Sequence, residues 1–206
     1  MIITTELQSI TVTEDVSSVA GPTPGDIEDI RLTLNGDGVA YARLVERYQA
    51  GISGRMWRFT RERAKHRELV QDVFVEAYLS LKTFKGKAPF GHWLARIATS
   101  VGYRHWRKEA RERSSQTVPL EDWDQPVWDE PDALEPEKAA EILHALLERL
   151  PPRDRLVLML RYVENRSIEE TAELAGWTRT MVKVQAWRAR NKLKKLFEAA
   201  GLEVER

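Results

Sequence analysis

Residues 147–197 contain two short helical patterns separated by a tight turn, and no other feature constrains the fold as strongly. Ser167 opens the first pattern, and Glu170 stands three residues later. This spacing predicts a capping box, in which the serine hydroxyl accepts a hydrogen bond from the third helical position and the carboxylate reaches back to the serine N–H. Gly176 is expected to end the helix, because glycine adopts the left-handed conformation at little cost. Thr178 is placed to cap the next helix.

The second helical pattern is strongly basic. Its apolar residues fall at helical spacing on one face, and they are Val182, Ala186, Ala189, Leu193 and Leu196. The basic residues occupy most of the remaining surface, and they are Arg179, Lys183, Arg188, Arg190, Lys192, Lys194 and Lys195. This is the pattern of a helix-turn-helix that lays its second helix in the DNA major groove. An ordinary helical hairpin with a solvated basic face is the alternative, but the capping box, the turn length and the one-sided charge favour DNA binding.

The formal net charge of +0 conceals a strong segregation of charge along the chain. Residues 40–113 hold 17 basic and 7 acidic residues, and residues 139–198 hold 12 basic and 8 acidic ones. Between them, residues 114–137 hold 8 acids and no base. Each basic block is therefore a candidate for contact with the phosphates of a nucleic acid.

We expect an all-α fold with two small helical domains joined by an acidic extended linker. The expected segments are a disordered tail (1–25), a first domain (26–113), the linker (114–136) and a second domain (137–206). In the first domain, residues 67–82 form the clearest amphipathic helix, and residues 92–112 predict a long helix. Gly51 and Gly54 are expected to interrupt the helical pattern that precedes the helix of residues 67–82.

Composition excludes several classes of protein. There is no cysteine, which excludes disulfides and thiolate zinc sites. No run of about 18 apolar residues is present, so membrane insertion is not expected. The start of the chain lacks the pattern of a secretory signal, which fits a cytoplasmic location. The acids and the four histidines show no metal-ligand spacing, so neither a metal, a cofactor nor an enzyme activity is expected.

Two sets of motifs resemble bacterial sigma factors of the extracytoplasmic-function class, the two-domain members of the sigma-70 family. The carboxy-terminal half contains LPPRDRLVLMLRYVENRSIEETAELAGWTRTMVKVQAWRARNKL, which is similar to region four of that family throughout. The amino-terminal half contains YARLVERY, ELVQDVF and GHWLARIA, followed by a basic helix end, and these are similar to region two. The resemblance covers residues 26–113 and 137–197.

The resemblance implies a promoter-specificity subunit that directs transcription initiation and performs no covalent chemistry itself. Region two would bind the clamp helices of core RNA polymerase and melt the −10 element of promoter DNA. Region four would grip the −35 element and touch the polymerase flap. Members of this class are often held inactive by an anti-sigma protein, which is a further expected kind of partner.

Residue roles follow from matching positions in the family's motifs. The polymerase-binding positions are Glu68, Gln71, Asp72 and Glu76. The −10 positions are Lys85, Lys87 and Phe90 in a loop that captures a flipped base, with Ser100, Arg104, Arg107 and Lys108 on the next helix. The −35 positions on the recognition helix are Arg179, Thr180, Lys183, Val184, Trp187 and Arg188. Among these, basic side chains can reach guanine or phosphate, and Val184 can pack on a thymine methyl group.

Some residues depart from the family's pattern. Lys65-His66-Arg67 stands where acidic residues are usual, which bears on polymerase binding. Ser100 and Arg104 replace a usual Asn and Asp, and Val184 and Gln185 replace the more common Ser and Arg. These changes predict an unusual promoter preference within an unchanged fold.

Two other functions are alternatives to that of a sigma factor. A stand-alone helix-turn-helix regulator would need only the second domain, with the first serving for dimerisation or ligand binding. The first basic block, with its acidic stripe, favours the sigma factor over that alternative. An enzyme that modifies nucleic acid is disfavoured, because the sequence lacks a nucleophile pattern, a metal site and a phosphate-binding loop.

Overall fold

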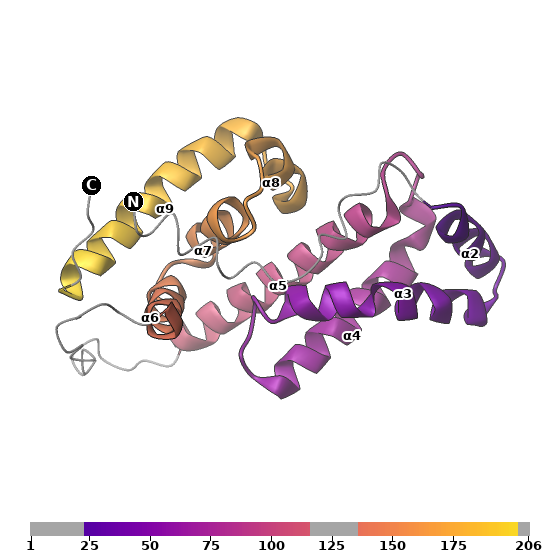
Figure 1. Cartoon of the computed structure of the whole chain (residues 1–206), viewed down its shortest axis with the longest axis horizontal. Coiled ribbons are helices and arrows are strands. Elements are labelled where there is room, and N and C mark those ends of the chain that lie inside the picture. Colours follow the sequence, from indigo (N-terminus) through magenta and orange to yellow (C-terminus); the bar gives the residue numbers. More distant parts are fainter. Residues whose placement is uncertain (1–22, 116–135, 202–206) are drawn as a thin grey trace. The chain divides into compact units, whose positions relative to one another are not determined.

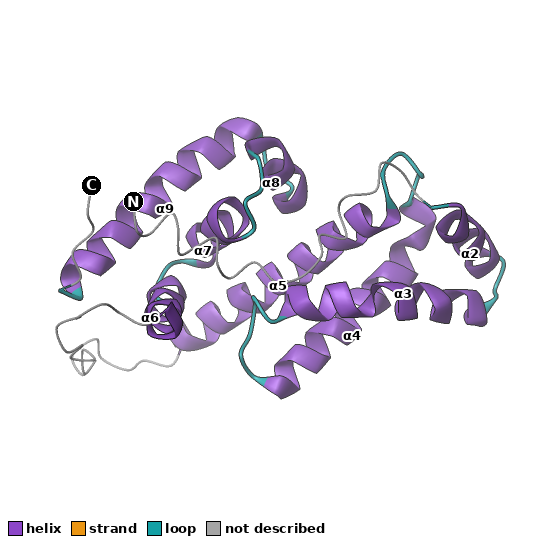
Figure 2. Ribbon diagram, in the orientation of Figure 1, coloured by secondary structure: helices purple, strands orange, loops and turns teal. Residues whose placement is uncertain are grey.

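The computed structural model describes residues 23–115 and 136–201, and within these ranges the chain is helical with no strand (Figures 1 and 2). It divides into two compact units, which are described separately. The N-terminal unit contains α2 (Pro24–Leu34), α3 (Gly38–Met56), α4 (Arg63–Ser80), the short 3-10 helix η1 (Leu81–Thr83) and α5 (Phe90–Ser115) as far as Trp106, and the end of α5 from Arg107 on groups with the C-terminal unit. The C-terminal unit contains α6 (Pro136–Glu148), α7 (Pro152–Leu158), the π-helical turn η2 (Met159–Val163), α8 (Ile168–Ala175) and α9 (Arg179–Ala199). The all-α expectation is thus confirmed.

The expected tail and linker fall mostly outside the described residues, which exclude 1–22 and 116–135. The first described helix, α2, begins at Pro24, slightly before the predicted start of the domain. Thr23 explains this start, because its hydroxyl accepts from the N–H of Asp26 and the Asp26 carboxylate accepts from the N–H of Thr23. Proline at the first helical position adds to the signal.

The predicted break at Gly51 and Gly54 is wrong, because α3 runs through both glycines to Met56. Each glycine weakens a helix by about 1 kcal/mol relative to alanine. Burial of Ile52 and Met56 on this same stretch outweighs that loss, since these side chains are only 5% and 0% exposed. The chain turns after Met56 instead, and Phe59 is buried within the turn.

The core of the N-terminal unit closes around a contact between the turn after α3 and the middle of α5. The ring of Phe59 lies against Gly102, where a Cβ atom would come within 2.3 Å of the ring. Trp106, one helical turn later, is 2% exposed and donates from Nε1 to the Phe59 carbonyl at 2.7 Å. The glycine therefore allows α5 to approach this turn closely.

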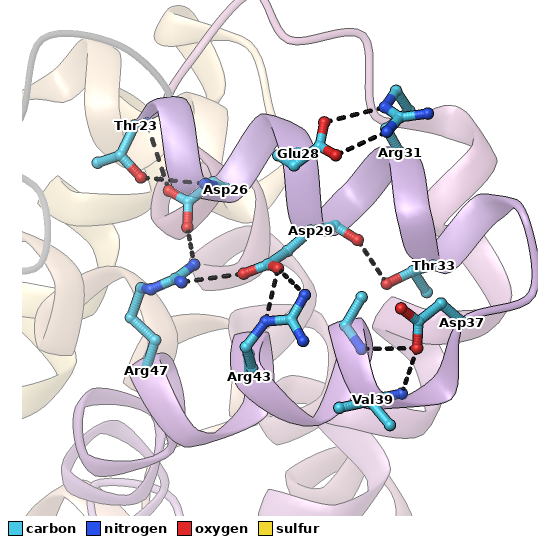
Figure 3. Close-up of polar contacts among 11 residues, drawn as sticks. Thr23, Asp26, Glu28, Asp29, Arg31, Thr33, Asp37, Val39, Arg43 and Arg47 are labelled. Atoms are coloured by element: carbon cyan, nitrogen blue, oxygen red, sulfur yellow. Dashed lines mark hydrogen bonds and ion pairs between the residues drawn. The ribbon is translucent and has the colours of Figure 1, made fainter.

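A network of charged side chains holds α2 against α3 (Figure 3). Asp29 of α2 accepts from Arg43 Nε at 2.8 Å and from Arg47 Nη2 at 3.0 Å, and Arg47 also bonds to Asp26. Asp26 further accepts from the hydroxyl of Tyr48 at 2.7 Å. Burial raises the pKa of Asp29, but hydrogen bonds from the two arginines outweigh it, so its pKa is lowered. The two buried carboxylates are thus paired, as buried charges must be.

The C-terminal unit packs α7, α8 and α9 around one apolar cluster. Its buried members are Leu147, Leu150, Val157, Leu158, Ala172, Val182, Ala186 and Ala189. After α6 ends at Glu148, Pro151 stands at the N-cap of α7 and Pro152 is the first residue of that helix. No helix within the described ranges has both the length and the apolar character needed to cross a bilayer.

Candidate nucleic-acid interface

The predicted helix-turn-helix consists of α8, a glycine turn and α9. Ser167 Oγ accepts from the N–H of Glu170 at 3.0 Å, and Glu170 Oε2 accepts from the N–H of Ser167 at 2.7 Å. The second of these hydrogen bonds is the largest cause of the lowered pKa of Glu170. Gly176 ends α8 with φ 68° and ψ 34°, and Thr178 caps α9 by accepting from the N–H of Met181 at 3.2 Å. The capping box, the glycine at the end of α8 and the Thr178 cap, all predicted from the sequence, are confirmed.

The six predicted recognition residues all lie exposed on α9 or at its start. They are Arg179, Thr180, Lys183, Val184, Trp187 and Arg188. The opposite side of α9 is buried, with Val182 and Ala189 at 0% exposure. Helix-turn-helix geometry therefore leaves these six side chains on the side of α9 that faces away from the protein.

The four residues predicted to bind polymerase lie on α4. Glu68, Gln71 and Asp72 are exposed, whereas Glu76 is half-buried because Arg104 of α5 forms a two-pronged ion pair with it. This hydrogen bond is also the largest cause of the raised pKa of Arg104. The structure thus joins an acid predicted to bind polymerase to a base predicted to bind DNA, so the two surfaces adjoin.

The residues predicted for the −10 element divide into exposed and buried members. Lys85 and Lys87 are exposed in the loop before α5, and the residues of α5 itself are exposed as well, namely Ser100, Arg104, Arg107 and Lys108. Phe90 is 2% exposed, and its ring packs against Tyr48, Phe84 and Trp93 at centroid distances of 5.3, 5.4 and 5.4 Å. The predicted contact of Phe90 with a nucleobase is corrected, because the ring is buried beneath the loop and does not lie on its outer surface.

The unusual Lys65-His66-Arg67 segment lies at the start of α4. His66 is 7% exposed, and its ring stacks on Trp57 at 3.8 Å with Nε2 2.9 Å from the Ser53 carbonyl oxygen. This histidine therefore has a structural role. Lys65 forms an ion pair with Glu68 at 3.1 Å, and Arg67 is exposed. The segment thus adds positive charge beside the acidic face of α4.

Comparison with known proteins identifies both halves of the chain. A family model described as Sigma-70 region 2 matches residues 44–112, and one described as Sigma-70, region 4 matches residues 140–193. The RNA polymerase sigma factor YlaC of Bacillus subtilis is 30% identical over 153 residues, which cover 74% of this chain and 88% of that protein. The chain belongs to the sigma-70 family.

A relative named as an ECF sigma factor places this sigma factor in the extracytoplasmic-function class. The ECF RNA polymerase sigma-E factor of Haemophilus influenzae is 30% identical over 167 residues, covering 75% of this chain and 86% of that protein. The RNA polymerase sigma-H factor of Pseudomonas aeruginosa is 30% identical over 181 residues, covering 84% and 94%. The structure of CnrH in complex with the cytosolic domain of CnrY has a TM-score of 0.53 at 24% identity, covering 85% of this chain and 98% of that one. That likeness supports the fold.

Sequence reasoning missed one polar network that shapes the recognition helix of this sigma factor. Asp154 of α7 is 1% exposed, and its carboxylate accepts hydrogen bonds from Gln185 Nε2 and, at 2.6 Å, from Lys192 Nζ. Gln185 and Lys192 stand seven residues apart, which places them on the same side of α9. This spacing was the only signal in the sequence, and nothing local identified Asp154 as their partner.

Proposed function

We propose that this sigma factor divides promoter recognition among three surfaces. The α4 face binds core RNA polymerase, the 85–91 loop with α5 binds the −10 element, and α9 binds the −35 element. One observation carries the proposal: apart from Phe90, the residues matched to these roles reach the surface of two domains that match regions two and four. The chain would perform this role in the cytoplasm as a specificity subunit, with the chemistry left to polymerase.

The α4 surface suits a basic protein partner. Glu68, Asp72 and Glu76 fall along one side of the helix, with Gln71 beside them. Carboxylates on one exposed face attract a basic surface and raise the association rate, even where each ion pair adds little affinity. Val75 and Leu79 continue this side of α4 and are 49% and 75% exposed, so the same face also offers apolar area for a stable complex.

The loop and α5 suit DNA in the process of strand separation. Lys85, Lys87, Arg107 and Lys108 are exposed cations on consecutive segments, and they can follow a phosphate backbone. The buried ring of Phe90 packs against Phe84 and Trp93 and so anchors the loop. The loop is therefore preformed for binding an extruded nucleotide. Extruding a base costs a few kcal/mol, which contacts in a preformed loop must offset.

Reconstitution with bacterial core RNA polymerase tests the proposal. We expect the full chain to co-elute with core enzyme on size exclusion and to direct run-off transcription from a limited set of promoters in a genomic library. Asp72→Lys should weaken co-elution, because it places a cation on the polymerase-binding face. Glu46→Lys makes the same charge change at an exposed position of α3 and serves as the matched control.

Two results would contradict the proposal. Equal loss of co-elution for Asp72→Lys and Glu46→Lys would show that net charge, and not the α4 face, controls binding. Specific DNA binding by the free chain with no association with polymerase would instead favour the stand-alone regulator.

A further inference from the structure

The outward side of the recognition helix presents apolar side chains in its first half. Val184 and Trp187 stand three residues apart on α9 and are 43% and 66% exposed. Residues at this spacing are neighbours on a helix surface. They lie opposite Val182 and Ala186, which face the core of the unit. The first half of α9 therefore carries a small apolar ridge on its exposed side, formed by Val184 and Trp187.

Cations flank this ridge on both sides. Lys183 and Arg188 are exposed next to it, and they can pair with phosphates or guanine edges. Arg179, at the start of α9, is also exposed and lies 3.6 Å from Glu169 of α8. Apolar side chains thus lie between the charges on the exposed side of α9.

Of the two amide side chains on α9, those of Gln185 and Asn191, the one next to Val184 is turned away from this ridge. Gln and Asn side chains pair with adenine when they reach the major groove. The Gln185 amide instead donates to the carboxylate of Asp154, and that carboxylate also holds Lys192. Because Asp154 is 1% exposed, the network fixes Gln185 against α7.

These contacts decide which base chemistry remains available beside Val184 and Trp187. In the major groove, thymine is the base that presents a methyl group, and apolar side chains are its natural partners. We propose that Val184 and Trp187 read thymine methyl groups in the −35 element, and that Asp154 is a positioning residue that keeps Gln185 out of the groove. This inference rests on the proposed function, because it requires α9 to bind the −35 element.

A substitution in the DNA tests the first half of the inference. After run-off transcription with the reconstituted holoenzyme has defined a promoter, each thymine of its −35 element is replaced singly by uracil, which removes only the methyl group. We expect promoter binding by the holoenzyme to fall by about fourfold at one or two of these positions, as for the loss of one buried methyl group. Val184→Ala and Trp187→Ala should abolish this preference for thymine at their own positions. Lys183→Ala should instead weaken binding to thymine and uracil promoters by the same factor.

Substitutions in the protein test the second half. Gln185→Ala should leave the base preference of the −35 element unchanged, because the amide does not reach the groove. Asp154→Ala should release Gln185 and create a new preference for adenine, and the double variant with Gln185→Ala should lose it. Should Asp154→Ala unfold the unit, the Gln185→Ala result decides this half by itself.

Each outcome has one meaning. Absence of holoenzyme-dependent transcription overturns both the proposed function and this inference. Active transcription with equal binding to thymine and uracil at every −35 position overturns the methyl readout alone. A change in base preference on Gln185→Ala overturns the role of Asp154 alone.

Discussion

Gly102→Ala is expected to destabilise the N-terminal unit although it alters no surface residue. The added Cβ atom would lie 2.3, 2.4 and 2.5 Å from three carbons of the Phe59 ring. Carbon atoms prefer separations of about 3.5–4.0 Å, so the ring would have to move by more than about 1 Å. Phe59 is 2% exposed and packs on Trp106 at a centroid distance of 4.6 Å, so it has little room to move.

The magnitude follows from two destabilising contributions and one stabilising contribution. Overpacking a core costs about 1–3 kcal/mol, and more where the surroundings are rigid. Displacing Phe59 also strains the hydrogen bond from Trp106, which contributes about 1 kcal/mol. The higher helix propensity of alanine returns about 1 kcal/mol. We therefore expect a net loss of about 2 kcal/mol in the free energy of unfolding, or a fall of roughly 8–16 °C in the Tm of this unit.

Thermal unfolding of the full chain, followed by circular dichroism, measures this change. Gly38→Ala is the matched control, because no atom lies within 4 Å of the Cβ position at this helical glycine. It should be neutral or slightly stabilising. Phe59→Leu should recover part of the loss in the Gly102→Ala background, since the smaller side chain makes room. A Gly102→Ala protein at least as stable as the wild type would refute the packing of α5 on this turn.

Three further predictions concern other parts of the structure. Ser167→Ala should lower the stability of the C-terminal unit by about 1 kcal/mol through loss of the N-cap, seen as a lower Tm; an unchanged Tm would count against the capping box. Arg104→Ala should change the free energy of unfolding by less than about 1 kcal/mol, because its pair with Glu76 is exposed, yet it should reduce run-off transcription; unchanged transcription would remove it from the DNA surface. Finally, the pKa of Asp29 is lowered in the folded state from an ordinary value of 3.8. Its contribution to stability is therefore fully present above that pH and is lost as the pH falls through the folded-state pKa. Asp29→Asn should flatten this acid-side decline in Tm, and an identical pH profile would contradict the pairing.

The sequence alone was sufficient wherever the deciding chemistry is local. The capping box at Ser167, the left-handed Gly176 and the cap at Thr178 involve atoms within a few residues of each other. Periodicity likewise separated the buried Val182 and Ala189 from the exposed side of α9. These features depend on backbone hydrogen bonds and on the helical repeat, which a short stretch of sequence already specifies.

Tertiary structure decided the features that depend on distant partners. Burial of Met56 carries α3 through two glycines that locally favour a break. An aromatic cluster removes Phe90 from the surface, although its place in a basic loop suggested a base contact. Asp154 meets Gln185 from 31 positions away, and only the packing of α7 on α9 brings them together. The sequence thus determined α8 and α9 with their caps and the two charged blocks, because those depend on neighbours along the chain. Which side chains remain free to touch DNA was decided by the folded core, because burial and long-range pairing are properties of packing.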